Sequence, residues 1–162
     1  MSGRTAHDEV AGWFVGRVPD GWFTAAPEVL VDREEIVVVG AIAVPDEAAT
    51  VGRVKRFREE TRDARMRIAD EAEVAFDRKV SWGVRVGDDR YVFTHLAVPV
   101  MTRLRQGERL VLDTLIDAGV ARSRSEALAW CVRLVDKHQG DWIDQLRDAL
   151  VHVEEVRKQS PL

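Results

Sequence analysis

A seven-residue segment of alternating character, residues 98–104, constrains the C-terminal part of the chain more than any other pattern. Leu104 is expected to point inward and Arg103 outward, so the alternation predicts a β-strand with one apolar face. The inward face carries Val98, Val100, Thr102 and Leu104, and the outward face carries Pro99, Met101 and Arg103. Because a strand this short is not stable alone, we expect it to pair with another strand.

Two helical segments follow this strand. Residues 106–118 have helical spacing, and Gly119 stands where a helix-ending glycine is expected. The run Ser123-Arg-Ser-Glu126 matches the Ser-x-x-Glu capping box and predicts a second helix that begins at Ser123 or Ser125. The expected buried positions are Leu110, Leu112, Leu115 and Ile116 in the first helix and Ala127, Leu128, Cys131, Leu134 and Val135 in the second.

A short strand, a helix, a glycine turn and a helix that starts with Ser-Arg-Ser-Glu-Ala-Leu resemble the ribbon-helix-helix family of DNA-binding proteins, the Arc and MetJ type. The resemblance covers about residues 98–138. It implies a homodimer in which two strands pair antiparallel and enter the major groove of duplex DNA, where each base pair presents a distinct pattern of donors and acceptors.

The resemblance also implies roles for individual side chains. Met101 and Arg103 would read bases, Arg103 through two hydrogen bonds to guanine and Met101 through apolar contact only. The N-terminus of the second helix would bind phosphate, because its first N–H groups lack acceptors and carry partial positive charge. The residues expected at that phosphate are Arg105, Arg122, Ser123, Arg124 and Ser125.

Residues 1–97 predict a separate α+β unit of order αββαββ, for which we recognise no family. An N-terminal helix would bury Val10, Trp13 and Phe14 and precede a hairpin at residues 28–44. A helix is predicted over residues 48–78, followed by a second hairpin with strands at residues 79–86 and 90–96. Residues 139–162 predict a C-terminal helix, so the fold class is α+β with parts 1–97, 98–138 and 139–162.

The helix predicted at residues 48–78 has an unusual distribution of charge. Its N-terminal half carries Arg53, Lys55, Arg56, Arg58, Arg62, Arg65 and Arg67, and its end carries Asp70, Glu71, Glu73 and Asp77. This order opposes the helix dipole. Two explanations remain open: the basic end contacts phosphate or an acidic partner, or the arginines pair with Glu59, Asp63 and Glu71 on a solvated face.

The formal net charge of −4 conceals an uneven distribution. Residues 98–140 hold seven basic and five acidic side chains, and the remaining parts are net acidic. The single cysteine, Cys131, excludes an intramolecular disulfide and is typical of a reducing compartment. Since no apolar run approaches the roughly 18 residues of a membrane span, we expect a soluble, cytoplasmic chain without a membrane partner.

The sequence contains no motif of an enzyme, since it has no phosphate-binding glycine loop, no cysteine pair and no Gly-x-Ser-x-Gly. We therefore expect no catalytic residues, no metal and no cofactor. Two hypotheses follow. The first is a dimeric ribbon-helix-helix transcriptional regulator whose residues 1–97 sense a ligand or recruit a protein partner. The second is a protein-interaction or antitoxin-like platform that uses the same dimer without sequence-specific DNA binding.

Overall fold

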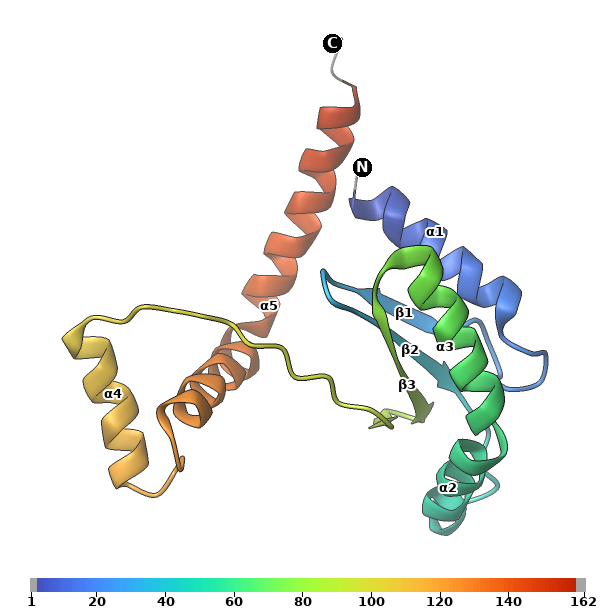
Figure 1. Cartoon of the computed structure of the whole chain (residues 1–162), viewed down its shortest axis with the longest axis horizontal. Helices are drawn as coiled ribbons and strands as arrows, with labels where there is room; N and C mark the ends of the chain where they lie inside the picture. The colour runs from blue at the N-terminus through green and yellow to red at the C-terminus, as the bar shows by residue number, and fades with distance from the viewer. Residues whose placement is uncertain (1–2, 160–162) are drawn as a thin grey trace. The chain divides into compact units, whose positions relative to one another are not determined.

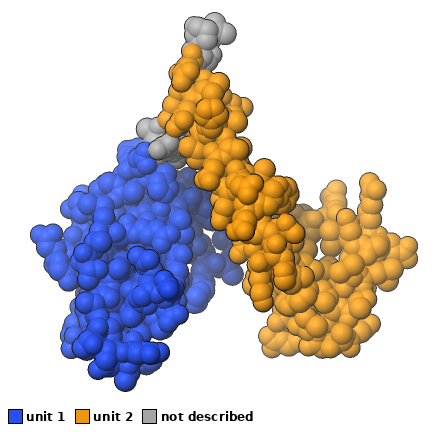
Figure 2. Space-filling view, turned by 180° about the vertical axis from the view of Figure 1, so that it is seen from behind, with its two compact units in different colours: residues 1–98 blue, residues 99–162 orange. Residues whose placement is uncertain are grey.

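The computed structural model describes residues 3–159, with side chains from His7 onward. It contains helices and one four-stranded sheet, which confirms the α+β class (Figure 1). The chain divides into two compact units, coloured separately in Figure 2. Unit 1 extends to Val98 and unit 2 begins at Pro99.

Unit 1 is built on a sheet of order β1-β2-β3-β4. Its strands are β1 (Glu28–Val31), β2 (Glu35–Ala41), β3 (Lys79–Val86) and β4 (Asp89–Val92). The outer pairs are antiparallel hairpins, as predicted, whereas β2 and β3 are parallel with Val38 opposite Trp82. A parallel pair needs a long crossover, and residues between β2 and β3 provide it with a short 3₁₀ turn (Glu47–Ala49), α2 (Thr50–Glu60) and α3 (Arg62–Phe76).

One face of this sheet carries the main core. Helix α1 (Gly3–Arg17) contributes Val10 and Phe14, and α3 contributes Ile68 and Ala72. The strands contribute Val29, Ile36, Val38 and Trp82 from positions that share one face. Burial of these side chains confirms the apolar spacing predicted for the N-terminal helix and for the strand at residues 79–86.

Two elements of unit 1 differ from the prediction. The helix expected over residues 48–78 is divided at Thr61, whose backbone has φ −94° and ψ −2°. The Thr61 hydroxyl donates to the carbonyl of Phe57 at 2.6 Å, a bond to the preceding turn that bends helices. The last strand ends at Val92 rather than at residue 96, and residues 94–105 form neither helix nor strand.

Unit 2 consists of α4 (Gln106–Asp117) and α5 (Arg124–Lys158). As predicted, Gly119 between them has a left-handed backbone with φ +77°. Helix α5 has non-helical torsion angles at Gln139, which separates a first half from the C-terminal half. Leu112, Ala121 and Ala127 are buried between the helices, with Leu104, Leu115, Ile116, Leu128 and Cys131 packed around them.

Part of the predicted core of unit 2 is exposed in the single chain. Leu110, Leu134 and Val135 are 56%, 38% and 49% exposed, although the helical spacing predicted their burial. The strand predicted at residues 98–104 is not formed: this segment is neither helix nor strand and pairs with no strand of the described chain. Helical spacing identifies an apolar face, but it does not show whether the rest of the same chain covers that face.

Within residues 3–159, no helix is both long enough and apolar enough to span a membrane.

Candidate nucleic-acid interface

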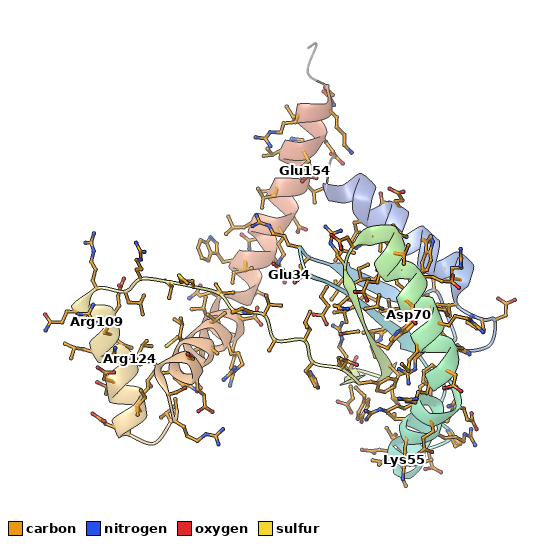
Figure 3. The ribbon with its side chains drawn as sticks, in the orientation of Figure 1. Glu34, Lys55, Asp70, Arg109, Arg124 and Glu154 are labelled. Atoms are coloured by element: carbon orange, nitrogen blue, oxygen red, sulfur yellow. The ribbon has the colours of Figure 1, made fainter. Side chains whose placement is uncertain are left out.

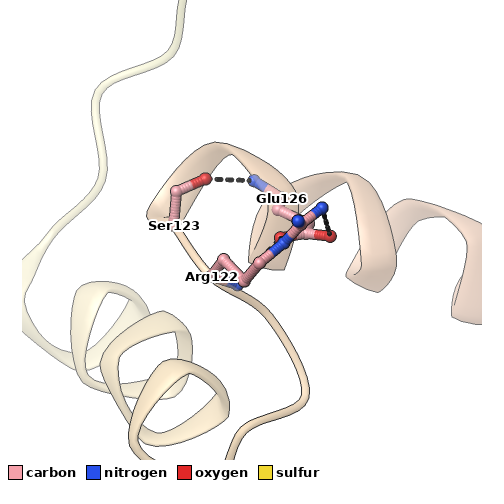
Figure 4. A network of polar contacts seen from close by, with 3 residues as sticks. All are labelled: Arg122, Ser123 and Glu126. Atoms are coloured by element: carbon pink, nitrogen blue, oxygen red, sulfur yellow. Dashed lines mark hydrogen bonds and ion pairs between the residues drawn. The ribbon is translucent and has the colours of Figure 1, made fainter.

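The N-terminus of α5 has the serine half of the predicted capping box, whereas the glutamate accepts from the residue before the cap. The Ser123 hydroxyl accepts a hydrogen bond from the Glu126 N–H at 3.1 Å (Figure 4). The Glu126 carboxylate accepts from the Arg122 backbone N–H at 2.8 Å and from its guanidinium at 3.3 Å. The hydrogen bonds from Arg122, of which the backbone bond has the larger effect, hold the pKa of Glu126 below its usual value.

Two N–H groups at this helix end remain available to an anion. Arg124 and Ser125 are the first residues of α5, and N–H groups in the first turn have no acceptor within the helix. Both side chains are exposed. The first turn of α5 therefore presents backbone donors to solvent, which is the arrangement that binds phosphate at helix ends.

Arg124 joins the two helices of unit 2. Its Nε and Nη2 atoms donate to the two carboxylate oxygens of Asp113 on α4, both at 2.9 Å. Figure 3 labels Arg124. This double hydrogen bond lowers the pKa of Asp113 and raises that of Arg124. Sequence reasoning missed the pair, because a separation of eleven residues across a turn follows no helical spacing.

Arg109 is a second residue that the sequence did not single out. Its Nη1 atom donates to the Leu104 carbonyl at 2.6 Å and so fixes the last residue of the 98–104 segment against α4. At the same place the Glu108 carboxylate accepts from the Arg105 backbone N–H at 2.7 Å. The spacing Arg105-x-x-Glu108 resembles a capping box at the glutamate end, which was the available signal for this contact.

The predicted base-reading residues lie in the extended segment before α4. Met101 is 91% exposed and Arg103 is also exposed. Met101 lines a hollow of about 360 Å³ together with Arg124 and Ser125, and Arg103 is not among the residues that line it. The structure thus brings one of the two base-reading candidates together with the helix N-terminus.

The five predicted phosphate residues differ in their availability. All five are exposed. Arg122 and Arg124 form ion pairs with Glu126 and Asp113, and the hydroxyl of Ser123 is used by the helix cap. Exposed ion pairs contribute only about 0–1 kcal/mol, so exchanging a carboxylate for a phosphate at these arginines costs little.

Within residues 3–159, no cluster of three or more potential ligands could hold a metal ion.

Comparison with known proteins identifies a family for both units. Residues 8–92 match the model of the Rv1265-like protein N-terminal domain, and residues 105–157 match that of the Mb1296 C-terminal domain. The chain is 58% identical over 157 residues to "Uncharacterized protein Mb1296" from Mycobacterium bovis. It belongs to the Rv1265-like family.

Two further Rv1265-like relatives, "Uncharacterized protein MT1303" and "Uncharacterized protein Rv1265", both from Mycobacterium tuberculosis, show the same 58% identity. Each of the three alignments covers 93% of this chain and 70% of the relative. No solved structure matches the chain. The residues between the two family models, 93–104, include the whole 98–104 segment.

Proposed function

We propose that this Rv1265-like protein is a homodimeric DNA-binding regulator whose unit 2 works as a ribbon-helix-helix module. The 98–104 segments of two copies pair antiparallel, and the resulting ribbon enters the major groove with Met101 and Arg103 facing the bases. The first turn of each α5 then contacts the phosphate backbone. DNA binding requires the compartment that holds the chromosome, so a cytoplasmic location is part of the proposal.

The observation that carries the proposal is that the apolar segment at residues 98–104, which alternates like a strand, has no partner in the described chain. Val98 and Val100 are 43% and 87% exposed, and the backbone from residue 98 to residue 103 makes no hydrogen bond within the described chain. Leu110, Leu134 and Val135 leave a second set of apolar atoms uncovered on the helices that follow. A second copy supplies both a strand for the backbone groups and an apolar face for these side chains.

The N-terminus of α5 supports the DNA contact in particular. Ser123 caps the helix without using the N–H groups of Arg124 and Ser125. Two such helix ends, one from each copy, flank the ribbon in a ribbon-helix-helix dimer, so each ribbon would have a phosphate contact on either side.

The test is binding of full-length protein to a library of genomic DNA fragments, followed by sequencing of the bound fraction. We expect enrichment of one sequence class, with affinity that falls steeply as salt rises. Arg103→Ala should relax the sequence preference, whereas Arg105→Ala should weaken binding to all sequences alike.

Arg147→Ala is the matched control, because it removes one exposed charge from the C-terminal half of α5, where Arg147 pairs with Asp144. We expect it to leave both affinity and preference unchanged. No binding at low salt, or equal effects of Arg103→Ala and Arg105→Ala, would reject the DNA contacts.

A second function uses the same dimer as a protein-interaction or antitoxin-like platform. It is favoured by the ion pairs of Arg122 and Arg124, which give two of the phosphate candidates partners inside the chain. In this function residues 1–97 bind a protein partner, and no catalytic step is involved. A stoichiometric protein partner from native lysate, with no enriched DNA, would support the platform over the regulator.

A further inference from the structure

Unit 1 contains a pocket with a large excess of positive charge. It has a volume of about 380 Å³ and lies where α2 meets α3, beneath Phe93, which follows β4. Four cationic side chains line it, Lys55, Arg58, Arg62 and Arg65, against one carboxylate, Glu59. Figure 3 labels Lys55 on α2.

Arg65 is the central cation of this pocket. It is only 7% exposed, and no carboxylate among the described residues forms an ion pair with it. Its Nε donates to the Thr61 hydroxyl at 2.9 Å, and its Nη2 donates to the Arg58 carbonyl at 2.7 Å. Burying a charge without an opposite charge is costly. Burial, and then the charges of Arg58 and Arg62, lower the pKa of Arg65 accordingly.

The remaining nitrogen of Arg65 is free to bind. Nη1 has no hydrogen-bond partner among the described residues. It is also reached by solvent, because the Trp82 indole nitrogen is the only side-chain nitrogen or oxygen atom of the described residues that is both fully buried and without a partner. The guanidinium carbon lies 5.0 Å from the centre of the Phe93 ring. The ring and the two hydrogen bonds therefore hold Arg65 in the wall of the pocket and leave Nη1 without a partner.

Arg58 and Arg62 stand beside this group. The Arg58 guanidinium carbon lies 5.7 Å from the same Phe93 ring, and Arg58 has no carboxylate partner among the described residues. Arg62 contacts the exposed Asp63 at 3.9 Å, and Lys55 contacts Glu59 at 4.0 Å. These two long contacts are weak, so the pocket retains net positive charge.

We propose that this pocket binds a small molecule through a phosphate or diphosphate group. A phosphate dianion neutralises more of the four cations than a single carboxylate does, and guanidinium groups bind it through paired hydrogen bonds. A small anion is favoured over the backbone of a nucleic acid because the central cation is buried in a pocket. The proposal does not depend on the function of unit 2, since every lining residue lies before Val98.

The test is calorimetric titration of the full-length protein with inorganic pyrophosphate at low ionic strength. We expect saturable binding, with Arg58→Gln and Arg62→Gln each weakening it about tenfold, the effect of losing one charge-assisted hydrogen bond. Arg56→Gln is the matched control, because it removes the same charge from α2 but pairs with Glu60 and does not line the pocket. It should change the affinity less than twofold.

Two further titrations define the ligand. Citrate should bind more weakly than pyrophosphate, and tighter binding of citrate would overturn the assignment to phosphate. Duplex DNA should bind Arg58→Gln as well as it binds the unchanged protein.

If Arg58→Gln weakens DNA binding while pyrophosphate does not bind, the pocket is a nucleic-acid contact and the proposal is wrong. The absence of saturable pyrophosphate binding, or equal effects of Arg58→Gln and Arg56→Gln, would also overturn it. Circular dichroism of each variant separates loss of binding from loss of fold.

Discussion

If the proposed dimer forms, Val100→Asp should prevent the association of two copies without unfolding the single chain. Val100 is 87% exposed in one copy, so the substitution removes almost no packing there. In a two-fold symmetric dimer the residue occurs twice. Full burial of a valine contributes about 1.5–3 kcal/mol, so the dimer loses about 3–6 kcal/mol in apolar burial alone. This loss raises the dissociation constant of the dimer by about 10² to 10⁴.

The dissociation constant can be measured by sedimentation equilibrium over a range of protein concentrations. Val74→Asp is the matched control, since Val74 is 89% exposed on α3 in unit 1 and lies outside the proposed interface. Val74→Asp should leave the dissociation constant unchanged. A Val100→Asp protein that dimerises as tightly as Val74→Asp would refute the burial of residue 100 between two copies.

Three smaller predictions concern unit 2, each checked by thermal or denaturant unfolding. Ser123→Ala should cost about 1 kcal/mol in free energy of unfolding because it removes the cap of α5, whereas Ser125→Ala, which removes no capping bond, should cost less. Asp113→Asn should destabilise the protein above the ordinary aspartate pKa of about 3.9. Because folding lowers the pKa of Asp113, its contribution is lost as the pH falls through the folded-state pKa, so the two proteins should converge in acid. Gly119→Ala should lower the free energy of unfolding by about 1–2 kcal/mol, because alanine is strained in the left-handed backbone of this position. Gly107→Ala inside α4 should be neutral or stabilising. No atom lies within 4 Å of the added methyl group at either position, so steric overlap does not contribute.

Local patterns in the sequence predicted most of the individual elements. The alternation at residues 79–86 places Trp82 and Val84 in the core. The Ser-x-x-Glu pattern predicts that the second helix begins at Ser123 or Ser125, and Ser123 is the N-cap of α5. These features depend on neighbours within one turn or one strand. The burial of Val10 and Phe14 follows from helical spacing for the same reason.

Features that depend on distant residues, or on hydrogen bonds of polar side chains, were not predictable in this way. Nothing near β2 or β3 indicates that the two strands pair in parallel, because the pairing joins residues more than forty positions apart. The Asp113–Arg124 pair and the bond from Arg109 to Leu104 arise from the turn geometry of unit 2. The break at Thr61 depends on a side-chain hydroxyl that apolar spacing ignores.

The division of the helix at Thr61 has a consequence for which residues this position tolerates. The hydroxyl donates to the Phe57 carbonyl and at the same time accepts from Arg65 Nε. Serine has the atoms to make both bonds, whereas valine matches the shape of threonine and makes neither. The break in the helix and the position of the Arg65 guanidinium therefore depend on the same hydroxyl. A substitution that removes it loses the bond to the Phe57 carbonyl and one of the hydrogen bonds that hold Arg65.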